Sequence, residues 1–447
     1  MTPKFNRRAI RLAAAVLFGL AATPLAAQVE TGLKIQEVTR DFLKLFRPSV
    51  SGAYLAGQHA MKDLRTDEAA RYFMDAARAD WENPILIERA FVALVTDGQV
   101  AEGAKMARRM LELDPQNELA RLVVATEALK ERRYGSVERQ VGAMSQDSFS
   151  GITAGILRAW AMVGDNRAAE ADKLMVQLGS SGLGDFLLFH RALMAEASGD
   201  TAQALKFAEE AYENEPFVAR ITEVYTRMLA NAGDFEAAQD VLDAYDAQGL
   251  SHPVIRIVAE AVEARRRPGV FTTSVQVGAA EMFHGIGVAL SRDGSADLAL
   301  VFLRLGLYLD PNADVIALAT GELLDQARQH EMANKIYDAI SPNSVMKPTA
   351  VVRIARNLDF LGDRTEAIRR LRNILAITPN DLDAVSVLGD LLRSDEKYLE
   401  AAEAYTAALG ITGGNSVSDW RFYYVRAIAY ERAKDWPRAE ADFLKAL

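Results

Sequence analysis

A strict 34-residue spacing of small residues limits the folds open to this chain more than any other feature of its sequence. Two sets of small residues share the register: Ala299, Ala333, Ala367 and Ala401, and, twelve residues before each of them, Gly287, Gly321, Ala355 and Gly389. A period of about 34 residues with two small positions per unit indicates stacked helix–turn–helix repeats. The physical reason is that two helices pack closely only where one of them offers Gly or Ala at the crossing.

These units resemble the tetratricopeptide repeat, which carries small residues at fixed positions and a closing proline. Pro311 and Pro379 close two of the units, and the run Asp435-Trp436-Pro437 to Leu447 shows the pattern again. The resemblance implies an all-α, right-handed superhelical solenoid of antiparallel helix pairs. More narrowly, 275–290, the irregular segment before it and 418–447 are similar to large exported tetratricopeptide proteins of alphaproteobacteria, which implies a periplasmic scaffold rather than an enzyme.

Composition agrees with a helical repeat array. Half of the 447 residues are apolar, and alternation typical of strands is scarce. The formal net charge is -10 and is spread along the chain, which argues against nucleic acid as a partner. Because the chain has no cysteine, it has no disulfide, no thiolate zinc site and no lipid-modified cysteine.

The first 27 residues have the three-part layout of a secretory signal. A basic start that ends at Arg11 is followed by the apolar run Leu12 to Ala22 and by the small-residue stretch Pro24 to Ala27. An uncleaved membrane anchor is the alternative, although the apolar run is short for a span. Arg7-Arg8 is also found in twin-arginine signals, but the residues after it fit the general export route better.

The register divides the rest of the chain. We predict a signal peptide over 1–27, a capping helix over 28–47, a first repeat block over 48–249, an irregular junction over 250–278 and a second block over 279–447. In the first block the register continues through Ala69, Gly103, Val137, Ala169, Ala204 and Ala238. Pro268-Gly269 breaks the helical pattern, so we expect 268–274 to be exposed and mobile. Since no polar cap follows Leu447, we also expect a longer native chain or another chain over this end.

A search for catalytic or metal-binding motifs finds none that is complete. His330-Glu331 would open a metalloprotease helix motif, but Asn334 stands where the second histidine belongs. The five histidines lie in separate units. Gly285-Ile286-Gly287 lacks the third glycine of a dinucleotide turn. We therefore expect no catalytic residue, no cofactor and no metal, and a chain that is not an enzyme.

The resemblance implies a protein-binding groove, lined by fixed positions on the first helix of each repeat. Those positions correspond here to Tyr54, Gln58, Glu223, Arg227, His284, Glu322, Asp325, Arg356, Asp359, Asp390, Arg393 and Tyr424, together with Ser291, Asp383 and Arg421. The lysine and asparagine with which chaperone adaptors of this superfamily clamp a terminal carboxylate are absent, because His284 and Val288 occupy those places. An acidic C-terminal peptide is therefore not the expected ligand.

The sequence thus predicts an exported scaffold that binds a segment of a partner protein in a groove of mixed charge. The alternative from another class is the helical regulatory or substrate-recruiting arm of an envelope enzyme or of a polysaccharide-export or outer-membrane assembly machine. We expect protein partners, no nucleic acid and no direct lipid anchor. The sequence does not name the partner or the oligomeric state.

Maturation is the first testable consequence. We expect the mature protein to begin at or near Gln28, because basic, apolar and small segments precede it in the order that signal peptidase requires. Intact-mass measurement on a cell-envelope extract checks this. Recovery of the full-length chain in the cytoplasm would contradict it.

Overall fold

The computed structural model describes residues 49–145, 148–179, 183–414 and 416–447. The chain separates into two compact units, residues 1–53 and Tyr54–Leu447, and only the beginning of helix α3 is described in the first unit. The predicted signal peptide and capping helix lie outside the described residues. Within the described part, no helix combines the length and the apolar character needed to cross a membrane.

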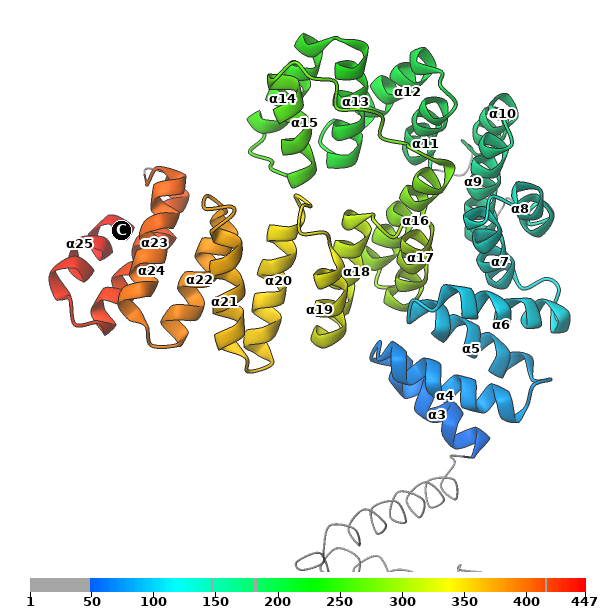
Figure 1. Cartoon of the computed structure of the whole chain (residues 1–447), viewed down its shortest axis with the longest axis horizontal. Coiled ribbons are helices and arrows are strands. Elements are labelled where there is room, and N and C mark those ends of the chain that lie inside the picture. Colours follow the sequence, from blue (N-terminus) through cyan, green and yellow to red (C-terminus); the bar gives the residue numbers. More distant parts are fainter. Residues whose placement is uncertain (1–48, 146–147, 180–182, 415) are drawn as a thin grey trace, which may run out of the picture. The chain divides into compact units, whose positions relative to one another are not determined.

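The described residues form helices joined by short loops (Figure 1). The helices are α3 Val50–Lys62, α4 Thr66–Ala79, α5 Pro84–Thr96, α6 Val100–Leu113, α7 Glu118–Lys130, α8 Tyr134–Val141, α9 Phe149–Gly164, α10 Ala168–Leu178, α11 Gly184–Ala197, α12 Thr201–Asn214, α13 Ala219–Ala232, α14 Phe235–Ala247, α15 Pro253–Glu263, α16 Val275–Arg292, α17 Ala296–Leu309, α18 Asp314–Gln326, α19 His330–Ala339, α20 Lys347–Phe360, α21 Arg364–Leu375, α22 Leu382–Ser394, α23 Tyr398–Thr412, η2 Val417–Asp419, α24 Trp420–Arg432 and α25 Trp436–Ala446. Successive helices contact each other from α4 to α15 and from α16 to α25. The predicted all-α array of helix pairs is therefore confirmed.

Short polar side chains fix where many of these helices begin. Asn117 accepts a hydrogen bond from the backbone N–H of Ala120 at 2.9 Å, and Asp381 accepts one from Ala384 at 2.8 Å. Such caps satisfy backbone donors that the first helical turn leaves without a partner. Pro115 and Pro379 stand just before these caps, where proline ends the preceding helix. The closing prolines of the repeat therefore set the turn between one helix pair and the next.

The small residues of the register lie where the two helices of a pair cross. A Cβ atom on Gly321 would stand 2.3 Å from the Tyr337 ring, and one on Gly389 would stand 2.6 Å from the Tyr405 ring. Both tyrosines are almost fully buried. Any larger residue than glycine would push the ring, and with it the second helix, out of contact. This close approach explains why the sequence repeats glycine or alanine at this position.

Helices α16 and α17 form a pair that packs against first helices of the preceding repeats. Helix α17 contacts α5 and α7, and α16 contacts α9 and α11 (Figure 1). The Arg304 guanidinium donates to the carbonyl of Thr96, the last residue of α5, at 3.0 Å. Gln276 donates to the Leu129 carbonyl near the end of α7 at 2.8 Å. A cationic donor at a helix C-terminus is favourable because it satisfies an unpaired carbonyl and complements the helix dipole.

The segment that precedes α16 is anchored rather than free, which makes our expectation for 268–274 wrong in part. Gly269 and Val270 are exposed, but Thr272 is buried. The Glu196 carboxylate accepts the backbone N–H groups of Phe271 at 3.2 Å and Thr272 at 2.8 Å. Two residues before Phe271, Gly269 donates its backbone N–H to the Asn231 side chain at 3.1 Å and accepts from it at 2.9 Å. The Pro-Gly break ends a helix, but side chains of α11 and α13 then bind the freed backbone groups.

One buried histidine lies in the aromatic interior. His190 of α11 contacts Phe186, Phe189 and Trp160 edge-on, with ring centroids 4.6 to 6.2 Å away. Neither ring nitrogen has a hydrogen-bond partner among the described residues. Burial lowers the pKa of His190 to about 4, and the more weakly acting charge of Glu281 opposes this shift. The imidazole is therefore neutral at physiological pH.

The crossing geometry predicts the effect of enlarging a small residue. Ala367 is fully buried in α21, so Ala367→Leu should overpack the pair and lower the free energy of unfolding by roughly 1–3 kcal/mol. Ala407→Leu on the exposed side of α23 is the matched control and should change stability by less than about 0.5 kcal/mol. Urea unfolding of both variants measures the difference. Equal effects of the two substitutions would contradict the assigned packing.

The buried imidazole predicts a pH dependence of stability. Since unfolded histidine titrates near pH 6.5 and folded His190 only near pH 4, the unfolded state binds more protons between these values. Stability should therefore fall as the pH drops, by about 2 kcal/mol between pH 7 and pH 5 from this residue. Urea unfolding of His190→Phe should show a correspondingly weaker loss, whereas His59→Gln at an exposed position should not. An unchanged pH profile in His190→Phe would refute this explanation.

Candidate functional site

The predicted groove residues fall into three groups: a pair on α3, a group on α13 and α16, and a group on the later repeats. On α13 and α16, Glu223, Arg227 and His284 lie in a buried cluster of charges, and Ser291 near the end of α16 is half-buried. Those on α18, α20, α22 and α24, the first helices of the later repeats, lie at or near the surface. We call the exposed or half-buried members of the later group the second-block face, which comprises Glu322, Asp325, Arg356, Asp359, Asp383, Asp390, Arg393, Arg421 and Tyr424.

The buried cluster joins α13 to α16. Arg220 of α13 donates to Glu223 at 2.5 Å and, through Nε, to Glu281 of α16 at 3.2 Å. Arg227 contacts Glu223 at 3.1 Å and donates to the carbonyl of Pro268 at 3.1 Å. His284 Nδ1 lies 3.6 Å from Glu281. Glu223, Arg227 and His284, which sequence reasoning assigned to a groove, are thus engaged inside the molecule.

The pKa shifts of Glu281 and Arg220 show that the charges of this cluster stabilise one another. Burial pushes the pKa of Glu281 upward, but Arg220 and His284 together outweigh it and hold that pKa well below its ordinary value. Burial likewise lowers the pKa of Arg220, but the neighbouring charges of Glu281 and Glu223 outweigh burial. The net effect is that the pKa of Arg220 is raised. Removing one member would leave the other charge buried and unpaired, which typically costs about 3–5 kcal/mol. The cluster therefore joins two parts of the chain and is not free to bind a partner.

At the N-terminal end of the array, the predicted pair Tyr54 and Gln58 is also internally bonded. The Gln58 amide donates to the Tyr54 hydroxyl at 2.7 Å. The Tyr54 ring packs edge-on against Phe73 with centroids 6.0 Å apart. Both residues are half-buried in α3. This arrangement fixes the pair of α3 and α4 and leaves little of either side chain for a ligand.

In the second block, several predicted residues combine surface position with an internal partner. Asp325 accepts from Tyr337 at 2.8 Å and from Asn357 at 2.6 Å. Asp390 accepts from Tyr405 at 2.8 Å, with Arg393 at 3.4 Å. These carboxylates therefore hold the crossing tyrosines in place.

Two further ion pairs bind neighbouring elements. Glu322 of α18 contacts Arg353 of α20 at 2.7 Å, and Asp359 contacts Arg364 at 2.6 Å. All four side chains remain partly exposed. They limit which charges of the second-block face are available to a partner.

Three charges of the second-block face remain available. Arg356 on α20, Asp383 on α22 and Arg421 on α24 are exposed, and within the described residues none of them has a carboxylate or cationic partner in hydrogen-bond range. Their signs alternate along three consecutive first helices. Such a surface can hold a polar segment through charge-assisted hydrogen bonds of both polarities.

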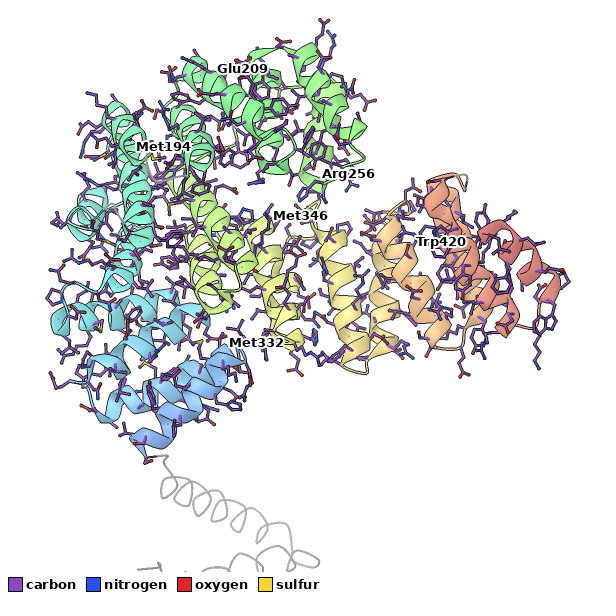
Figure 2. All side chains as sticks on the ribbon, turned by 180° about the vertical axis from the view of Figure 1, so that it is seen from behind. Met194, Glu209, Arg256, Met332, Met346 and Trp420 are labelled. Carbon is purple, nitrogen blue, oxygen red and sulfur yellow. The ribbon has the colours of Figure 1, made fainter. Side chains whose placement is uncertain are left out.

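Aromatic side chains extend this face at α24. Tyr424 is 46% exposed and lies 6.4 Å from Trp420, which is 54% exposed (Figure 2). Phe443 of α25 meets the Tyr424 ring edge-on at 6.0 Å. Sequence reasoning selected Tyr424 but missed Trp420, because Trp420 precedes the first inward-facing position of its repeat. The sequence signal that could have identified Trp420 is the presence of two tryptophans, Trp420 and Trp436, in the last helix pair.

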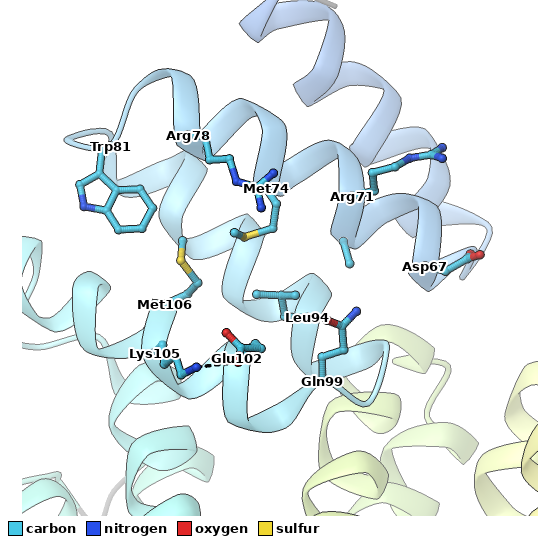
Figure 3. A pocket seen from close by; sticks show the side chains of 11 residues that line it. Asp67, Arg71, Met74, Arg78, Trp81, Leu94, Gln99, Glu102, Lys105 and Met106 are labelled. Atoms are coloured by element: carbon cyan, nitrogen blue, oxygen red, sulfur yellow. Dashed lines mark hydrogen bonds and ion pairs between the residues drawn. The ribbon is translucent and has the colours of Figure 1, made fainter. Parts of the chain in front are cut away.

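A second concave surface escaped sequence reasoning altogether. A cavity of about 510 Å³ lies along α4 and α6, and its lining includes Trp81, Met74 and Met106 (Figure 3). These helices are second members of their repeats, whereas the groove prediction considered first members only. Among the described residues, no group of three or more His, Asp or Glu side chains is placed to hold a metal ion.

The known proteins to which this chain is similar are distant from it in sequence. No protein-family model matches the sequence. Anaphase-promoting complex subunit 3 of Schizosaccharomyces pombe is 22% identical over 131 residues, which is 29% of this chain and 20% of that protein. The chain therefore spans about a fifth of that relative's length.

Solved structures with related folds include three examples. The C-terminal part of a TPR repeat-containing protein from Cytophaga hutchinsonii is 13% identical with a TM-score of 0.35, covering 58% of this chain and 94% of that one. MamA from Desulfovibrio magneticus is 21% identical with a TM-score of 0.32, covering 37% and 92%. The TPR domain of P58(IPK) is 17% identical with a TM-score of 0.25, covering 86% and 98%.

These likenesses concern the fold alone, and the repeat assignment stands on the chain's own geometry. Helix pairs recur at about 34 residues over most of the chain, glycine or alanine occupies most of the crossings, and side-chain caps follow the closing prolines Pro115 and Pro379. In its fold the chain is an all-α array of helix pairs that resembles the tetratricopeptide repeat.

Proposed function

We propose that this protein is a scaffold that binds a segment of a partner protein on the second-block face. The observation that carries the proposal is an asymmetry between equivalent surfaces. The first helices α5, α7, α9 and α11 are contacted by the chain's own α16 and α17. The first helices α20, α22 and α24 carry exposed charges and aromatic rings with no such cover among the described residues.

The chemistry of this face defines the segment it would hold. Arg356 and Arg421 offer donors, Asp383 offers an acceptor, and Trp420 with Tyr424 offers an apolar anchor. A partner segment with both acidic and basic residues and at least one apolar side chain is complementary to this set. Aromatic residues supply much of the energy at protein interfaces, while charges at the rim mainly supply specificity.

The site of action follows from the N-terminal sequence. The basic, apolar and small segments of residues 1–27 support export to the periplasm. The absence of cysteine is compatible with an oxidising compartment, because such a chain forms no unwanted disulfides. We therefore propose that the scaffold acts in the bacterial cell envelope, where the partner would be a periplasmic protein or a component of an envelope assembly.

Photo-crosslinking identifies the partner and tests which face binds it. A photoreactive amino acid at Ser386, half-buried on α22, should give adducts with a discrete protein in living cells. The same probe at Thr406 on α23, the second helix of that repeat, should not. Mass spectrometry of the adducts identifies the partner. Adducts of equal yield from the two positions would argue against the second-block face.

Charge reversal then tests the proposed contacts with the identified partner. Arg356→Glu combined with Asp383→Lys should weaken binding at least tenfold, since both side chains are exposed and free of internal ion pairs. Helical content and melting temperature should stay unchanged. Lys335→Glu combined with Glu403→Lys on α19 and α23 is the matched control and should leave affinity intact. Isothermal titration calorimetry measures both, and unchanged affinity in the first variant would overturn the proposal.

A further inference from the structure

The cavity along α4 and α6 is a groove with an apolar floor and a charged rim. Leu94 and Met106 are nearly buried and form the floor, with Met74 half-buried beside them (Figure 3). Trp81, 43% exposed, stands at one end. Methionine side chains adapt their shape to different apolar partners, which is why they are common at helix-binding surfaces.

The loop that carries Trp81 is held in position. Arg109 of α6 donates to the Trp81 carbonyl at 3.3 Å and contacts Glu82 at 2.7 Å. Its guanidinium also lies 6.0 Å from the Trp81 ring centroid. The loop that carries the indole is thus held by contacts within the protein. An exposed tryptophan beside an apolar floor resembles the anchor residues of protein interfaces.

Three other pairs of neighbouring second helices are tied together by ion pairs across the gap between them. Glu138 of α8 pairs with Arg167 at the start of α10 at 2.6 Å. Arg370 of α21 pairs with Asp338 of α19, and Arg372 of α21 pairs with Glu400 of α23, both at 2.5 Å. Within the described residues no ion pair joins α4 to α6. The gap between these two helices is therefore not bridged in the described part of the chain, as is also true of the gap between α10 and α12, where a cavity of about 490 Å³ lies.

The two rims of the groove differ in charge. On α6, Lys105 and Glu102 neutralise each other at 2.6 Å. On α4, Arg71 has no carboxylate partner among the described residues, and Arg78 has only an exposed contact with Asp75 at 3.3 Å. Arg71 and Arg78 are seven residues apart on one helix face, or about 10 Å along the axis. Asp67 lies at the far end, so the α4 rim beside the methionines is cationic.

We propose that this groove is a second protein-binding surface, which takes an acidic amphipathic α-helix of a partner. The apolar stripe of that helix would lie on Met74, Leu94 and Met106, with a large side chain against Trp81. Carboxylates about two turns apart on its flank would face Arg71 and Arg78, matching the spacing of the two guanidinium groups. This surface is separate from the second-block face, so the scaffold would join two partners at once.

A peptide titration tests this inference directly. The probe is a fluorescein-labelled, helix-stapled peptide of about 14 residues, with leucines at i, i+3, i+4 and i+7 and glutamates along one flank. Its counterpart carries lysine in place of every glutamate. Fluorescence anisotropy at physiological salt, where long-range attraction is screened, should show saturable binding of the acidic peptide and at least tenfold weaker binding of the basic one. No saturable binding of the acidic peptide, or equal binding of the two peptides, would overturn the proposal.

Variants locate the peptide on the groove. Arg71→Glu with Arg78→Glu should weaken acidic-peptide binding at least tenfold, and so should Trp81→Ala. The matched control is Arg139→Glu with Arg256→Glu, which should bind the acidic peptide normally. Both residues are exposed, on α8 and α15, and lie away from the groove; Arg256 is labelled in Figure 2. Circular dichroism melting confirms that each variant is folded.

The second-block variant separates this proposal from the proposed function. Arg356→Glu with Asp383→Lys should retain full affinity for the acidic peptide. Loss of peptide binding in that variant, with binding kept in the α4 and Trp81 variants, would place the peptide elsewhere and refute the inference. Loss of peptide binding in the α4 and Trp81 variants, with binding kept in the second-block variant, supports the inference even if the second-block face proves not to bind a partner.

Discussion

Close contact between two helices at a glycine or alanine is the interaction on which the whole array depends. Gly389 allows Tyr405 to lie flat against the first helix of its repeat, and Tyr405 then donates to Asp390. The same arrangement recurs with Gly321, Tyr337 and Asp325. A small residue, a buried ring and a carboxylate thus act as one unit at these crossings. Because each repeat contacts mainly its neighbours, stability accumulates along the chain through these pair contacts.

The same geometry decides which surfaces remain for binding. Once the tyrosine hydroxyls have engaged Asp325 and Asp390, those carboxylates are no longer free, although the sequence predicted them to line a groove. The helix pair α16 and α17 covers a further surface, that of the first helices α5, α7, α9 and α11. In this contact Arg304 and Gln276 donate to carbonyl groups at the ends of α5 and α7. Lys130 of α7 in turn donates to the carbonyl of Leu309, the last residue of α17. The remaining free charges, at Arg356, Asp383 and Arg421, thereby become the best-supported binding positions.

Sequence reasoning reached the repeat fold but only part of the site, for physical reasons that particular residues illustrate. Glycine and alanine at 34-residue intervals report a local contact, so the helix pairs were predictable. The partner of Arg220 lies 61 positions away, at Glu281, and nothing local in the sequence indicates that pair. Pro268-Gly269 correctly ended a helix, but the carboxylate that anchors the following backbone comes from Glu196. The groove beside Trp81 depends on how the side chains of α4, α5 and α6 pack around it, and that is a property of side-chain geometry.

Hydrogen exchange of the intact chain, followed by mass spectrometry, measures most directly whether α16 and α17 cover the preceding repeats. Buried helices exchange only through opening reactions that approach global unfolding, whereas exposed loops exchange within seconds. The structure predicts that amides in α17, and those of Phe271 and Thr272 bound by Glu196, exchange as slowly as amides in α5 and α9. Rapid exchange at α17 and at these two amides, with α5 and α9 still protected, would show that the first helices are uncovered and would contradict this account.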